Sequence, residues 1–175
     1  MTTTTTSTTI PESAIGGALR EEVLRHRASL LERLQAGEDG IALGRSNAAF
    51  LDRLMKALFE QVSGQNSQTS QRGRDAEPMP ELAAVGSFGR GAVALRSDAD
   101  VRLLVSPRGK AREQGAKLAE ALLYPLWDAA LSIGHQVMDA TEALNLAQSD
   151  LATATAILDL RHLAGDPSMV LCKPR

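Results

Sequence analysis

The chain has 175 residues, of which 43% are hydrophobic and 23% charged, and its formal net charge at pH 7 is −2. This length suits one domain that buries roughly 70% of the surface of its unfolded chain, and the small negative charge argues against a nucleic-acid partner. The single cysteine, Cys172, permits no internal disulfide, and no apolar run approaches the ~20 residues that span a bilayer. Because the threonine-rich start also lacks the basic and apolar regions of a signal peptide, we expect a cytoplasmic protein with no membrane partner.

The first part of the chain predicts two helices behind a tail. Residues 1–12 begin with a low-complexity threonine run and are predicted to be disordered. Apolar residues then recur at helical spacing in two stretches, the first ending near Gly37 and the second with Ser46 as its candidate N-cap. We expect a helical hairpin over residues 13–63, a flexible polar loop over residues 64–80 and a single core over residues 81–175.

The segment 82–105, LAAVGSFGRGAVALRSDADVRLLV, predicts a strand, a glycine-rich turn with a short helix, and a second strand. Asp98 and Asp100 are two residues apart, so on a strand their carboxylates share a face and repel each other. A bound cation relieves that repulsion, and hard oxygen ligands of this kind suit Mg²⁺. A solvated turn is the alternative explanation of the pair.

The glycine turn supplies the other half of the predicted site. At Gly86 and Ser87 the backbone N–H groups can approach an anion closely, because Gly86 has no Cβ. The acidic pair and the turn together predict a site for a metal-bound triphosphate. Arg90 either contacts phosphate or is an exposed helix residue.

The remainder of the chain predicts further helices and one more strand. Residues 111–124 form a helix that Pro125 kinks or ends, and residues 133–138 form a strand. Asp139 and Glu142 are spaced as a capping box for a helix from about 140 to 148. A last helix is expected over residues 150–163, and Trp127 and His135 are interpreted as structural residues rather than ligands.

Several of these motifs resemble a known family. The pattern Gly86-Ser87 followed by Asp98-Ala99-Asp100 is similar to the signature of polymerase-beta-type nucleotidyltransferases. Within that superfamily the chain resembles the protein-PII uridylyltransferases, over nearly its whole length except the first dozen residues and the loop near 64–80. The segments that carry this likeness are AVGSFGRG and SDAD, YPLWD at 124–128, Gly-His at 134–135, and DLATAT at 150–155.

The resemblance implies an α/β fold, in which a small mixed sheet is flanked by helices and joined to the N-terminal hairpin. It implies Mg²⁺-dependent transfer of uridylyl from UTP to a tyrosine of the PII signal protein, as in nitrogen regulation, with release of pyrophosphate. Asp98 and Asp100 would be the catalytic metal ligands, and Gly86 and Ser87 would hold phosphate. The family places a third carboxylate on a neighbouring strand, for which Asp139 is the positional candidate beside its capping role.

The chain also departs from the family, which has an apolar residue at the position of Arg102 and usually a glutamate at that of Ala92. By the period of two, Arg102 shares the face of Asp98 and Asp100, so we expect it to pair with one of them or with nucleotide phosphate. Family members continue into a metal-dependent HD hydrolase domain and ACT domains, neither of which is expected here, so we expect no uridylyl-removing activity. Two alternatives stay open, namely adenylyl transfer to a protein or small molecule, and a degenerate module that binds nucleotide without catalysis.

Overall fold

The computed structural model describes residues 12–67 and 78–167, so the predicted tail lies almost wholly outside the described part, and so does most of the predicted loop. Four strands form one sheet in the order β3-β2-β1-β4, with bounds β1 Glu81–Val85, β2 Ala99–Leu104, β3 Ile133–Met138 and β4 Arg161–Ala164. The central strand β1 is antiparallel to β2 and β4, whereas β2 is parallel to β3. The predicted α/β fold with a small mixed sheet is therefore confirmed.

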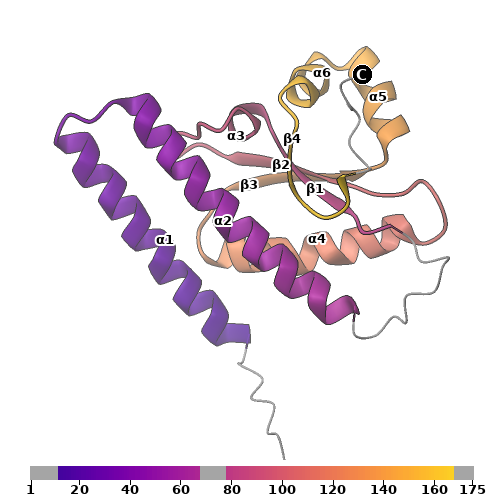
Figure 1. Ribbon diagram of the computed structural model, residues 1–175, viewed down its shortest axis with the longest axis horizontal. Helices are drawn as coiled ribbons and strands as arrows, with labels where there is room; N and C mark the ends of the chain where they lie inside the picture. Colours follow the sequence, from indigo (N-terminus) through magenta and orange to yellow (C-terminus); the bar gives the residue numbers. More distant parts are fainter. Residues whose placement is uncertain (1–11, 68–77, 168–175) are drawn as a thin grey trace, which may run out of the picture.

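Helices cover both faces of this sheet (Figure 1). The long helices are α1 Glu12–Gln35, α2 Gly40–Ser67 and α4 Ala111–Asp128, and they share one hydrophobic core with the sheet face of Leu82, Val101 and Leu103. The opposite face is covered by α5 Ala140–Ser149 and α6 Leu151–Leu158. Covered on both faces, β1 is buried along its whole length.

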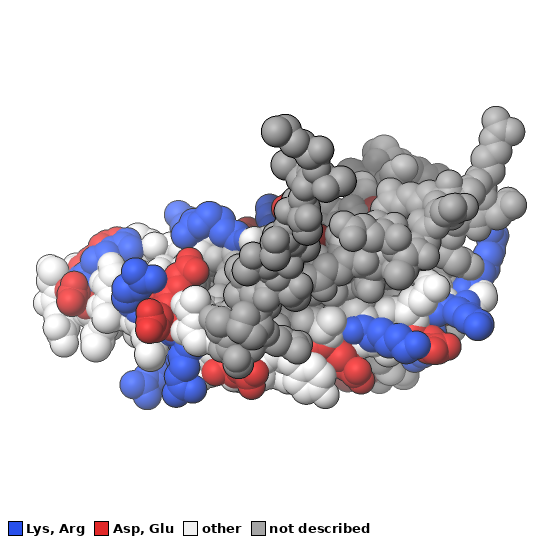
Figure 2. Space-filling model, turned by 90° about the horizontal axis from the view of Figure 1, so that it is seen from below, with Lys and Arg blue, Asp and Glu red and all other residues white. Residues whose placement is uncertain are grey.

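The exposed surface mixes charges of both signs. Figure 2 shows basic and acidic side chains interspersed on the face seen from below, in keeping with the formal net charge of −2. None of the helices in the described ranges is long and apolar enough to cross a membrane.

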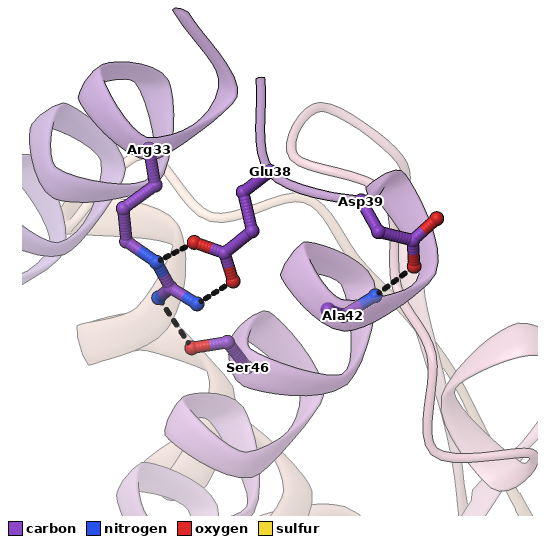
Figure 3. A network of polar contacts seen from close by, with 5 residues as sticks. All are labelled: Arg33, Glu38, Asp39, Ala42 and Ser46. Carbon is purple, nitrogen blue, oxygen red and sulfur yellow. Dashed lines mark hydrogen bonds and ion pairs between the residues drawn. The ribbon is translucent and has the colours of Figure 1, made fainter. Parts of the chain in front are cut away.

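The helical hairpin is present, but its second helix begins earlier than predicted. Asp39 caps α2, because its Oδ2 accepts from the Ala42 N–H at 2.9 Å. Ser46 lies inside the helix instead, where its hydroxyl accepts from Arg33 Nη1 at 2.9 Å (Figure 3). Arg33 also holds Glu38 through both carboxylate oxygens, which ties the last turn of α1 to the interhelical turn. The prediction of Ser46 as N-cap is therefore wrong.

Two further helix boundaries differ from the sequence-based expectation. The helix α4 continues through Pro125 to Asp128, and Leu126 in that extra turn is fully buried. The predicted helix over 150–163 is wrong for its last five residues, since α6 ends at Leu158 and the chain then forms β4. The physical reason is long-range, because β4 pairs with the buried strand β1 and buries Leu163, whereas Leu158 is 85% exposed.

A buried glutamate begins β1. Glu81 is 0% exposed, its Oε1 lies 2.8 Å from Nδ1 of His162, and its Oε2 has no hydrogen-bond partner among the described residues. Burial raises the pKa of Glu81, and the hydrogen bond and charge of His162 oppose part of that rise. The carboxyl group therefore holds its proton more tightly in the folded protein than in the unfolded chain.

This tighter proton binding sets the sign of a pH dependence. The stabilisation by Glu81 is fully present below its ordinary pKa of 4.5 and is lost as the pH rises through the higher folded pKa. We expect Glu81→Gln, which removes the titration, to gain in unfolding midpoint relative to wild type as pH is raised from about 4 to about 8. Thermal unfolding at several pH values measures this. Glu113→Gln is the control. Because the hydrogen bond from Lys117 lowers the pKa of Glu113, this variant should lose unfolding midpoint relative to wild type as the pH rises. An equal difference between Glu81→Gln and wild type at all pH values would contradict the prediction.

Candidate active site

The carboxylate of Asp100 lies between two glycines that come from different parts of the chain. Asp100 pairs with Val85 of β1 on one side and with Gly134 of β3 on the other. Its Oδ1 lies 2.2 Å from the position that a Cβ would take on Gly134, and its Oδ2 lies 3.9 Å from the corresponding position on Gly86. A side chain at residue 134 would therefore occupy the place of the carboxylate itself.

The glycine turn follows β1 directly and begins beside this carboxylate. Its short helix, α3 Gly86–Gly89, starts at a residue whose φ is +58°, a left-handed conformation that favours glycine. Two backbone bonds close the turn, from Arg90 N to Gly86 O and from Ala92 N to Ser87 O, at 3.0 and 3.1 Å. The half-buried Ser87 is therefore held within the turn that leaves β1 next to Asp100.

Asp98 is exposed and stands one residue before β2 begins at Ala99. The loop that leads to it is anchored on α2, because Val93 N donates to Gly44 O at 3.0 Å and Asn47 Nδ2 donates to Val93 O at 3.1 Å. The helical hairpin thus fixes the loop between the glycine turn and the acidic pair.

Asp139 does not lie near this carboxylate. Its side chain accepts from Thr141 N at 2.8 Å and Glu142 N at 2.9 Å, and the capping box of α5 is complete. The parallel register pairs Asp100 with Gly134, so Asp139 stands five residues further along, about 16 Å at the rise of a strand. One ion cannot contact both carboxylates in this arrangement, so Asp139 serves as the helix cap rather than as the third ligand that its position suggested.

Arg102 shares the face of Asp100 but makes no ion pair among the described residues. It is half-buried, Nη1 donates to the carbonyl of Val101 at 3.0 Å, and the buried Nε has no hydrogen-bond partner in the part that the structure describes. Burial lowers the pKa of Arg102, and the charge of Asp100 opposes that effect. The expected ion pair with Asp98 or Asp100 is thus replaced by a bond to the backbone.

Asp159 is a residue of this region that sequence reasoning missed. It forms an ion pair with Arg90, so Arg90 is already engaged. The antiparallel register pairs Ala84 with Arg161, which carries residue 159 to the level of Gly86, and the carbonyl oxygen of Asp159 lies 2.0 Å from the Cβ position of Gly89. The sequence pattern predicts one helix through residue 163, and a helix there would not bring Asp159 beside the glycine turn.

An aromatic group lies at the edge of the sheet beside Gly134. The Trp127 ring is 5.6 Å from the His135 ring and 5.7 Å from that of Tyr124, and Trp127 is 39% exposed. Trp127 and His135, both interpreted as structural residues rather than ligands, therefore contact each other at an exposed edge of the sheet, and Trp127 lies outside the buried core.

The carboxylates predicted from the sequence are of the kind that would hold a magnesium ion shared with a substrate. Among the described residues no group of three or more His, Cys, Asp or Glu side chains could hold a metal. Mg²⁺ nevertheless needs only one or two carboxylates when it keeps several waters and takes substrate phosphates as its other ligands, and Asp98 and Asp100 would be those carboxylates. Gly86 places no side chain beside Oδ2 of Asp100, which lies 3.9 Å from the position that a Cβ would take there.

The chain is similar to part of three curated proteins named bifunctional uridylyltransferase/uridylyl-removing enzyme. Those from Bradyrhizobium sp. strain BTAi1 and strain ORS 278 are 33% and 32% identical over 154 residues, or 88% of this chain. The protein from Novosphingobium aromaticivorans is 33% identical over 87% of it. The chain spans 16% of the length of each relative. No family model matches it.

The close approach of Gly134 and Asp100 can be tested by adding one methyl group. We expect Gly134→Ala to displace the Asp100 carboxylate, which can rotate away, so that the fold survives while Mg²⁺-dependent UTP affinity falls by about tenfold or more. Calorimetric titration measures the affinity and circular dichroism the fold. Gly64→Ala is the matched control, because a Cβ there meets nothing within 4 Å. Unchanged affinity in Gly134→Ala would show that this carboxylate holds no metal.

The positive charge of Arg102 should oppose a cation on the same face. We expect Arg102→Leu to raise Mg²⁺ affinity severalfold, since the guanidinium lies in the field of Asp100 without an ion pair. Arg102→Lys keeps the charge and should stay near wild type. If Arg102→Leu and wild type bind Mg²⁺ and UTP alike, Arg102 does not contribute to this site.

Proposed function

We propose that this chain, a relative of one part of the bifunctional uridylyltransferase/uridylyl-removing enzymes, is a nucleotidyltransferase that moves uridylyl from UTP to a tyrosine hydroxyl of the PII signal protein. The observation that carries this proposal is the Asp100 carboxylate set between the Gly86 turn and Gly134. The relatives' name supports the uridylyl group, and the choice of acceptor follows from the resemblance of the sequence motifs. The reaction is proposed to take place in the cytoplasm, where nucleoside triphosphates and Mg²⁺ are available.

Each residue of the site has a separate proposed role in this reaction. Mg²⁺ bound by Asp98 and Asp100 would neutralise the triphosphate and orient its α-phosphate for in-line attack. The backbone at Gly86 and Ser87 approaches the phosphates, because no Cβ stands at residue 86. The tyrosine oxygen forms a bond to the α-phosphorus, the bond to the β-phosphate oxygen breaks, and pyrophosphate leaves while the hydroxyl proton is released.

A second function is favoured by one observation, the half-buried guanidinium of Arg102 beside Asp100, which makes no ion pair among the described residues and whose Nε has no partner there. A cation there weakens metal binding, so a module that binds nucleotide without transfer is the second candidate. The two functions differ in whether label from a nucleotide becomes covalently attached to protein.

The transfer assay uses each labelled nucleoside triphosphate with Mg²⁺ and PII, and scores label on protein. We expect UTP to be the donor, and we expect Asp98→Asn and Asp100→Asn to lower the rate by about a hundredfold or more, because each removes one charged metal ligand. Asp139→Asn is the control, since asparagine still caps a helix and the residue lies far from Asp100. Transfer that survives in both acidic-pair variants would contradict the assigned site, and label from ATP instead of UTP would favour adenylyl transfer.

A further inference from the structure

Arg161, the first residue of β4, stands behind the glycine turn and joins it to helix α2. Its Nη1 and Nη2 hold both oxygens of Asp52 at 2.8 and 2.9 Å. Its Nε donates to the carbonyl of Gly89 at 3.1 Å, and Nη2 also donates to that of Phe88 at 3.0 Å. The guanidinium carbon lies 5.6 Å from the centre of the fully buried Phe88 ring.

These bonds add donors to those of the turn itself, in which the Phe88 carbonyl accepts from the Gly91 N–H at 3.0 Å. The last carbonyls of any helix lack partners within it, and α3 has only four residues, too few to be stable by itself. Arg161 supplies donors to both of the last two carbonyls of α3. The packing there leaves little freedom, since a Cβ on Gly89 would lie 2.0 Å from the Asp159 carbonyl oxygen.

The opposite end of the same turn lies at the candidate site. Gly86 begins α3 beside Asp100, whereas Phe88 and Gly89 end it against Arg161. A displacement of the carbonyl end therefore moves the backbone that faces Asp100. Asp52, in turn, fixes the guanidinium relative to α2, the helix that also anchors the loop before Asp98.

We propose that Arg161 is a positioning residue, which sets the distance between the glycine turn and Asp100. It does so by donating to the carbonyls of Phe88 and Gly89 while its ion pair with Asp52 keeps the guanidinium in place. This inference rests on the proposed function for its consequence in catalysis, but its structural part stands on the contacts of Arg161 alone. Arg161 acts through the turn, because its bonds are to Asp52, Phe88 and Gly89.

The substitution that tests this role is Arg161→Lys. Lysine keeps the positive charge opposite Asp52, but an ammonium group is a point charge that cannot hold a carboxylate in a bidentate way and two carbonyls at once. We expect hydrogen exchange at the amides of Arg90 and Gly91, which donate to Gly86 O and Phe88 O, to become about tenfold faster. We expect the KM for UTP to rise about tenfold with a smaller change in kcat.

The matched control is Arg33→Lys. Arg33 also holds a carboxylate through both oxygens and a third group, Ser46, and its side chain is 37% exposed against 34% for Arg161 (Figure 3). It has no bond to the glycine turn. Arg33→Lys should therefore change the unfolding midpoint to a similar extent while leaving the exchange at Arg90 and Gly91, and the KM, as in wild type.

The outcomes separate this inference from the proposed function. Unchanged exchange at Arg90 and Gly91 in Arg161→Lys overturns the positioning role, as does an equal KM change in Arg33→Lys. If exchange is faster in Arg161→Lys but the wild-type chain transfers no label, the proposed function is overturned and the positioning of the turn by Arg161 is still supported. If Arg161→Lys does not fold, Asp52→Asn replaces it, because it loosens the same guanidinium and should speed exchange at the same two amides.

Discussion

The structure depends on the position of β2 between two partners of opposite direction. Its antiparallel pairing with β1 brings the end of β1, and hence the glycine turn, to Asp100. Its parallel pairing with β3 brings Gly134 under the same carboxylate. A slip of one residue in either register would turn Asp100 toward the hydrophobic core of Val101 and Leu103. The burial of those two side chains therefore fixes the direction of the carboxylate.

The parts predicted correctly from the sequence are those whose signals are local. The strand, glycine turn and strand between residues 82 and 105 follow from apolar runs with glycines between them, and the capping box at Asp139 follows from a spacing of three. Strand β4 has no such signal, because its four residues follow directly on a helical pattern. Only its pairing with β1, far away in the sequence, decides its conformation.

The contrast between local sequence signals and long-range strand pairing also explains which residues of the candidate site were predicted correctly. Asp139 is a candidate from the sequence because it follows a predicted strand. In the parallel register, however, Asp100 lies beside Gly134, and Asp139 comes five residues later, well beyond Asp100. Asp159 is brought to the level of Gly86 by the antiparallel pairing of β4 with β1, and β4 is the strand that could not be predicted. The position of each of these carboxylates relative to Asp100 is thus set by strand pairing, whereas spacing along the chain predicts only pairs such as Asp98 and Asp100.

Arg102 shows how a change at such an edge can alter chemistry without altering the fold. Its neighbours Val101 and Leu103 point into the core and maintain the strand, whereas Arg102 points to the face of Asp100. The guanidinium stays charged at ordinary pH even when burial lowers its pKa. That charge would oppose a cation on the two carboxylates but would attract a triphosphate, whose negative charge exceeds theirs. If the site binds nucleotide as proposed, the residue would shift its preference from free metal toward nucleotide, and a metal ion would bind most favourably together with its phosphates.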